Sequence, residues 1–190
     1  MPSLTEGCVV TGFNPVRLRG HLRAASNSNA TAQARGRAYE DALTYLFGSL
    51  PGCTTRRNSL NKFESEEIDI IVANHRFDDG LKMLPPIFLV ECKNWSAPVD
   101  SSTISIFLQK IENRACRVGI LVAASGVTGD AENLKSAHHQ ASLALARGII
   151  LILLTSHDLR RLESPDEFVS LLHGRFLDVY AAGTFVTPNS

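Results

Sequence analysis

The sequence lacks the features that mark zinc-binding, membrane and secreted proteins. Its four cysteines are scattered, without a CxxC pair or histidines at zinc-ligand spacing. They are expected to be reduced thiols in a cytoplasmic protein. The longest apolar run, Gly148 to Leu154, is far shorter than the roughly 20 residues that cross a bilayer. The first residues also lack the charged-then-apolar pattern of a secretion signal, so no membrane partner is expected.

The chain has no net charge, but its charges are unevenly distributed. It contains 19 lysines and arginines against 19 acids. Residues 1–39 hold five arginines and one glutamate, so the remainder carries a net charge of −4. A basic leader of this kind either contacts the phosphate backbone of nucleic acid or is a solvated arm. The neutral total argues against strong, indiscriminate binding of nucleic acid by a single copy.

Length and composition indicate one globular domain. The 190 residues, 44% of them hydrophobic and 20% charged, are enough to bury a sizeable core. We expect a basic N-terminal arm at residues 1–31, which can be partly ordered. The core is expected at residues 32–160, followed by a C-terminal helical extension at residues 161–190.

Hydrophobic periodicity predicts the order α-β-β-β-α-β-α-β-α-α. The strands are expected at residues 53–59, 67–73, 87–93, 118–123 and 149–154. The helices are expected at residues 32–49, 102–113 and 128–147, directly after Thr155-Ser156, and at residues 166–180. The alternating second half implies right-handed crossovers. The predicted fold class is therefore α/β, with a central mixed five-stranded sheet flanked by helices on both faces.

The most informative segment is Val90-Glu-Cys-Lys93, at the end of an apolar strand. Alternate residues of a strand share a face, so Glu91 and Lys93 point the same way and Cys92 points to the other side. The preceding predicted strand carries Asp69 inside its own apolar run. If these strands are neighbours, Asp69, Glu91 and Lys93 form a metal-activated hydrolytic site.

The chemistry of these groups suits Mg²⁺, for which Mn²⁺ is expected to substitute. Mg²⁺ prefers oxygen ligands and keeps several of its waters. Asp69 and Glu91 would supply carboxylate oxygens, and Cys92 its backbone carbonyl. A metal-bound water has a lowered pKa and can act as the nucleophile. Lys93 would orient that water or offset negative charge on the phosphate.

Two residues on predicted helices extend the candidate catalytic set. Glu40 lies at the edge of the apolar stripe of its helix, where it can be a metal ligand or a base for the water. The alternative for Glu40 is a solvated acid beside Asp41. Gln109 can hydrogen-bond a ligand carboxylate or a phosphate, or it can be an exposed helix position.

Candidate nucleic-acid contacts flank the predicted acid strands. They are Arg56, Arg57, Lys62 and Trp95. The basic residues are also typical of a charged loop, and Trp95 either stacks on a base or packs over the sheet edge.

The pattern Glu40, Asp69, Glu91-Cys92-Lys93, with the aspartate and the glutamate 22 positions apart, resembles the PD-(D/E)xK nuclease superfamily. Within it the chain is most similar to the Mrr-type restriction endonuclease catalytic domain, over roughly residues 32–160. The matching stretches are residues 36–40, 67–71, 90–94 and 149–159. Archaeal Holliday-junction resolvases share the acid order and are a weaker match.

The resemblance implies a restriction-endonuclease-like fold and a Mg²⁺-dependent endonuclease that hydrolyses DNA phosphodiester bonds. The implied roles are bacterial restriction or defence, and DNA repair. Sequence specificity would come from a homodimer or a partner subunit. Two alternatives are a non-catalytic, nuclease-like scaffold subunit of a defence complex and a nuclease that cleaves RNA.

The chain departs from the Mrr-type pattern just before Asp69. Gly-rich residues are usual there, whereas this chain has Glu64-Ser-Glu-Glu67. Extra acids at this position repel nucleic acid unless they bind metal or turn outward.

Overall fold

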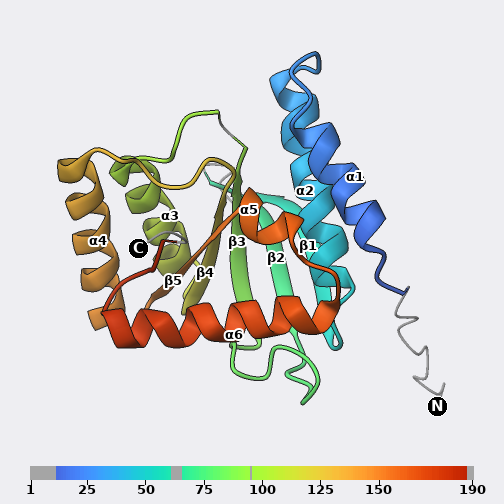
Figure 1. The fold of residues 1–190 in the computed structure, drawn as a ribbon. Coiled ribbons are helices and arrows are strands. Elements are labelled where there is room, and N and C mark those ends of the chain that lie inside the picture. Colours follow the sequence, from blue (N-terminus) through green and yellow to red (C-terminus); the bar gives the residue numbers. More distant parts are fainter. Residues whose placement is uncertain (1–11, 61–65, 95, 188–190) are drawn as a thin grey trace.

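A five-stranded sheet runs through the centre of the molecule, with helices on both faces (Figure 1). The computed structural model describes residues 12–60, 66–94 and 96–187. The strands, in spatial order, are β1 (Cys53–Leu60), β2 (Glu67–Asn74), β3 (Ile87–Lys93), β4 (Val118–Ala123) and β5 (Ile150–Thr155). β1, β2 and β3 pair antiparallel, whereas β3, β4 and β5 pair parallel. The mixed sheet confirms the predicted fold class.

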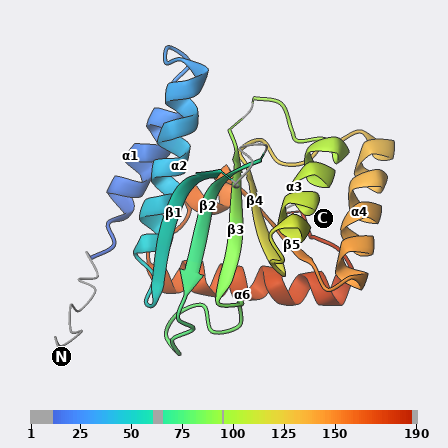
Figure 2. The ribbon, with the colours of Figure 1, turned by 180° about the vertical axis from the view of Figure 1, so that it is seen from behind.

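The helices separate into two layers, each with its own hydrophobic cluster. One layer contains α1 (Pro15–Ala25), α2 (Ala32–Gly48), α5 (Ser156–Arg160) and α6 (Pro165–Ala182). The other contains α3 (Ser101–Asn113) and α4 (Ala131–Ala146), which are seen best from behind (Figure 2). Every element predicted from residue 32 onward is present, with small shifts at its ends. In the described part of the chain, no helix combines the length and apolarity that spanning a bilayer requires.

Helix α1 was not predicted, because it lies in the segment interpreted as a basic arm. It begins at Pro15, and the Asn14 side chain caps it by accepting hydrogen bonds from two backbone amides. Leu18, Leu22 and Ala25 are buried against the rest of the fold. The arginines on its exposed side hid this narrow apolar stripe in the sequence.

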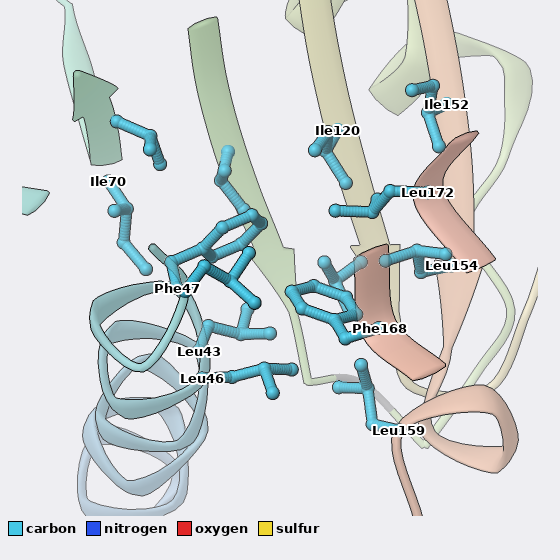
Figure 3. Close-up of a cluster of buried hydrophobic side chains, with 14 of the residues drawn as sticks. Leu43, Leu46, Phe47, Ile70, Ile120, Ile152, Leu154, Leu159, Phe168 and Leu172 are labelled. Carbon is cyan, nitrogen blue, oxygen red and sulfur yellow. The ribbon is translucent and has the colours of Figure 1, made fainter. Parts of the chain in front are cut away.

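The largest cluster fixes α2 against both the sheet and α6 (Figure 3). Phe47 of α2 makes edge contacts with Phe88 of β3 and Phe168 of α6, at centroid distances of 5.8 and 5.1 Å. Leu43 and Leu46 fill the space beside it (Figure 3). Aromatic edge contacts of this kind add to the free energy of apolar burial. Helix α2 therefore has a fixed position relative to β3, which matters because both elements carry candidate catalytic residues.

The contact between β4 and α3 is so close that only glycine fits at position 119. A Cβ atom on Gly119 would lie 2.2 Å from Ile111 Cδ1 and 2.9 Å from Phe107 Cε1. Gly119→Ala is therefore expected to lower the free energy of unfolding by about 1–3 kcal/mol through overpacking. Denaturant unfolding of the purified protein measures this loss.

A matched control for this prediction lies in α6. Gly174 is helical, and a Cβ atom there would meet no described atom within 4 Å. Gly174→Ala is expected to stabilise the protein by about 0.5–1 kcal/mol, because glycine is a poor helix former. Equal effects of the two substitutions would contradict the close packing of β4 on α3.

Candidate active site

Pairing between β2 and β3 stops beside the candidate acids. The last paired residues are Ile70 and Val90, whereas β3 stays paired with β4 as far as Lys93. Beyond the last pair, Asp69 Oδ2 accepts a hydrogen bond from the Cys92 backbone amide at 2.7 Å. A side-chain oxygen thus satisfies a strand amide, and it holds Asp69 beside the Glu91-Cys92-Lys93 segment.

Glu91 is a buried carboxylate, only 2% exposed. Its Oε1 atom lies 2.9 Å from the ammonium groups of both Lys93 and Lys110. Its Oε2 atom is also buried, and it has no hydrogen-bond partner among the described residues. A buried charge needs paired charge and hydrogen bonds. The two lysines meet this need on one oxygen and leave the other available to a ligand.

The environment of Asp69 disfavours its charged form. The pKa of Asp69 is raised from an ordinary value of 3.8 to about 6. Burial is the largest cause, and repulsion by the nearby Glu91 carboxylate is the second. The Cys92 amide and Lys93 act in the opposite direction and offset only part of the effect. A cation bound between the two carboxylates would remove the repulsion and favour the charged form.

The donor set fits a divalent ion that keeps part of its water shell. Within residues 12–60, 66–94 and 96–187, no three His, Cys, Asp or Glu side chains are grouped to hold a metal. Asp69 and Glu91 supply two carboxylates whose charges interact at this end of β3. Two carboxylates, with waters in the remaining positions, form a set that Mg²⁺ accepts.

Glu40 was expected to be a metal ligand or a base for the water; among the described residues it forms no three-acid metal-binding group with Asp69 and Glu91. Its Oε2 atom lies 2.8 Å from the Arg57 guanidinium. It is still close enough for its charge to contribute to the raised pKa of Asp69. Glu40 and Cys92 line the same surface pocket, so Glu40 lies at the edge of the site.

Arg57 is engaged with acids, which is not the expected contact for a phosphate-binding residue. Its guanidinium pairs with Asp41 as well as Glu40 on α2. The reason is the register of the sheet. Arg57 is opposite Ile70, whose side chain packs on the α2 face, so Arg57 points to α2 as well. Its neighbour Arg56 points to the other face and is exposed.

Lys110, and not Gln109, is the α3 residue that reaches the acids. Gln109 is exposed, whereas Lys110 donates a hydrogen bond to Glu91 Oε1. Helical geometry could have indicated this difference. At 100° per residue, Lys110 borders the buried stripe of Ile104, Phe107 and Ile111, and Gln109 lies on the opposite side.

Two of the predicted nucleic-acid contacts cannot be placed in the structure. Lys62 and Trp95, proposed as nucleic-acid contacts, lie outside the described residues. In the acidic segment before Asp69, Glu66 accepts hydrogen bonds from Arg114 and Asn113 on the α3 side. The charge of Glu66 is thus neutralised within the protein.

Comparison with known proteins identifies the family. A restriction endonuclease model of the Mrr catalytic type matches residues 31–162. The chain belongs to this restriction endonuclease family. No curated protein matches the chain. The match confirms the resemblance drawn from the acids and the lysine, and it makes the core a restriction-endonuclease-like nuclease. The matched region begins after α1 and ends before α6, so both helices lie outside it.

The raised pKa of Asp69 predicts that the site destabilises the metal-free fold. Between pH values of about 4 and 6 the native state binds more protons than the unfolded state, so stability falls as the pH rises through this range. Asp69→Asn keeps an acceptor for the Cys92 amide and removes the charge. In EDTA at about pH 7 the variant is expected to be more stable by on the order of 1–2 kcal/mol, after allowing for partial solvent exposure.

Urea unfolding at about pH 4 and pH 7 measures this difference, which should nearly vanish at the lower pH. A variant that is less stable than wild type at neutral pH would show that the Asp69 charge is not strained in the fold.

Proposed function

We propose that the protein is a Mg²⁺-dependent endonuclease that hydrolyses DNA phosphodiester bonds. The observation that carries this proposal is the buried Glu91 carboxylate, whose Oε2 atom has no hydrogen-bond partner among the described residues. It lies in the same site as Asp69, whose pKa of about 6 reflects burial and the repulsion of Glu91. The family supports the proposal, because restriction endonucleases generally use divalent metals and act on DNA.

Each group in the site has a role that follows from its contacts. Asp69, Glu91 Oε2 and the Cys92 carbonyl would hold the ion. When bound, the ion supplies a water of lowered pKa and neutralises charge that develops on the phosphate. Lys93 is held by Glu91 Oε1, and its ammonium group offsets the charge of the non-bridging phosphate oxygens. Lys110 fixes the orientation of Glu91 from α3.

Glu40 is proposed as the base that receives a proton from the attacking water. Arg57 holds its carboxylate in place, and Glu40 lines the same pocket as Cys92, which lies between Glu91 and Lys93 in the sequence.

Cleavage assays with acid and lysine variants test the proposal. Wild type should cleave DNA with Mg²⁺ or Mn²⁺ and lose this activity in EDTA. Asp69→Asn and Lys93→Ala are each expected to lower the cleavage rate by about 100-fold or more, because each removes charge that acts on the transition state. Parallel reactions with RNA of the same sequence test the alternative substrate.

The matched controls lie on the loop between β2 and β3. Asp78 and Lys82 form an exposed ion pair with each other, at 3.2 Å. Asp78→Asn and Lys82→Ala change the same charges outside the site, and they should leave cleavage unchanged. If the site and control variants behave alike, the assigned site is not catalytic.

A specific observation favours the second candidate, a non-catalytic scaffold. In the described residues Glu91 is already paired with two lysines and Glu40 with an arginine, and no three-acid metal group is present. A scaffold could use these ion pairs for structure alone.

Metal binding distinguishes the two candidates. An ion that binds only the native state raises the melting temperature in a concentration-dependent way. Mn²⁺ is expected to stabilise wild type and to have much less effect on Asp69→Asn, as measured by calorimetric unfolding. A scaffold would show the same small response in both proteins.

The biological role is proposed from the family. Bacterial restriction, defence or DNA repair would use this activity, with specificity supplied by a second copy or a partner subunit. Cleavage of both strands of a duplex requires two active sites, which favours a homodimer.

A further inference from the structure

Three adjoining hollows lead away from the edge of the candidate active site. The first contains Glu40 and Cys92, and it shares Arg35 and Asn94 with a second hollow of about 670 Å³. The second hollow shares Arg160 with a third, which extends along α1. Neighbouring hollows share lining residues, and the three together, here called the track, extend from the end of β3 to α1.

This track is lined by positive charge. Arg35 borders the first two hollows, Arg160 joins the second to the third, and Arg19 and Arg23 line the third. Arg23 and Arg160 are both exposed. Arg19 forms an ion pair with Glu163 at 2.7 Å, so it is partly neutralised. The exposed arginines therefore dominate the outer part of the track.

The segment that carries these arginines is anchored to the catalytic strand. Asn94 directly follows Lys93, and its side-chain amide donates hydrogen bonds to the carbonyls of Ala25 and Arg35. Arg160 of α5 donates to Ser26 Oγ at 3.0 Å. These contacts join both arms of the α1–α2 hairpin to the end of β3. Figures 1 and 2 show the turn of the hairpin at the end of the sheet from which the chain leaves β3 for α3.

We propose that this track, defined by Arg23, Arg35 and Arg160, binds the sugar-phosphate backbone of duplex DNA next to the scissile phosphate. The proposal rests on the proposed nuclease function and specifies where the substrate lies. Arginine binds phosphate oxygens through parallel N–H donors, and fixed guanidinium groups along a groove follow a charged backbone. Helix α1 would thus contribute Arg23 to a DNA contact whose other two arginines lie in the matched region.

The alternative path over β1 is less suitable for a phosphate backbone. Arg57, its most central cation, is bound to Glu40 and Asp41. A phosphate there would have to displace two carboxylates, whereas Arg23 and Arg160 already face solvent. The affinity of the protein for DNA should therefore depend on the α1 and α5 arginines.

The experiment measures duplex DNA affinity in EDTA, where no cleavage occurs. Fluorescence anisotropy with a labelled duplex over a series of salt concentrations compares wild type with the double variant Arg23→Gln/Arg160→Gln. The loss of two phosphate contacts should lower affinity roughly 10-fold or more and reduce the salt slope by about 2. Glu163→Gln should have the opposite effect, because it removes the ion-pair partner of Arg19.

Matched variants separate the effect of the track from total charge and from folding. Arg117→Gln/Arg147→Gln removes two exposed arginines at the opposite end of β4 and β5, and it should bind DNA like wild type. Arg23→Lys/Arg160→Lys keeps the positive charges and should restore the salt slope, and it should recover only the part of the affinity that does not need parallel N–H donors. Thermal unfolding checks that every variant is folded.

The inference is overturned if the Arg23/Arg160 variant binds DNA as tightly as the Arg117/Arg147 control, or if wild type binds no duplex DNA. It is also overturned if these arginines affect binding of an RNA duplex only. If wild type cleaves DNA but the Arg23/Arg160 and Arg117/Arg147 glutamine variants bind it equally well, the track is rejected and the nuclease function stands. Binding without metal-dependent cleavage would reject the nuclease function alone.

Discussion

The carboxylate of Glu91 is the group on which the site depends, because it is a charge held inside the protein. An isolated buried charge costs several kcal/mol, and it is tolerated only with partners in good geometry. Lys93 provides one partner from the same strand, and Lys110 provides the other from α3. The pairing therefore links β3 to α3, which covers it. Both lysines pair with Oε1, whereas the buried Oε2 atom has no hydrogen-bond partner among the described residues.

Asp69 lies where the pairing between β2 and β3 stops. A strand continuing in register would offer a carbonyl to the Cys92 amide, but here the Asp69 carboxylate takes that hydrogen bond. The exchange places two acids close together in a poorly solvated position, which raises the pKa of Asp69. Strain of this kind is common where function requires it, and a bound cation can relieve it. The end of the β2–β3 pairing therefore holds two carboxylates that a bound cation would stabilise.

The sequence predicts the parts of this structure that depend on local pattern. The continuous apolar runs of β4 and β5 are typical of strands buried on both faces, and the alternation around Glu91 places it on the same side as Lys93. It does not predict contacts that depend on how separate elements pack. The pairing of Arg57 with Glu40 requires both the β1 register and the position of α2. Lys110 was missed for the same reason, although its place beside the α3 apolar stripe was a usable signal.

Helix α1 lies outside the matched region but is hydrogen-bonded to the residue that follows β3. Asn94 satisfies carbonyls on both arms of the α1–α2 hairpin, so movement of the hairpin would leave those hydrogen bonds unmade. The residue directly after Lys93 thereby fixes the position of a basic helix relative to the acids. Binding and chemistry are then coupled through one short segment of backbone, residues 91–94. A substrate aligned by α1 would also be aligned with the Asp69 and Glu91 carboxylates, because hydrogen bonds at the end of β3 hold both α1 and Asp69 in position.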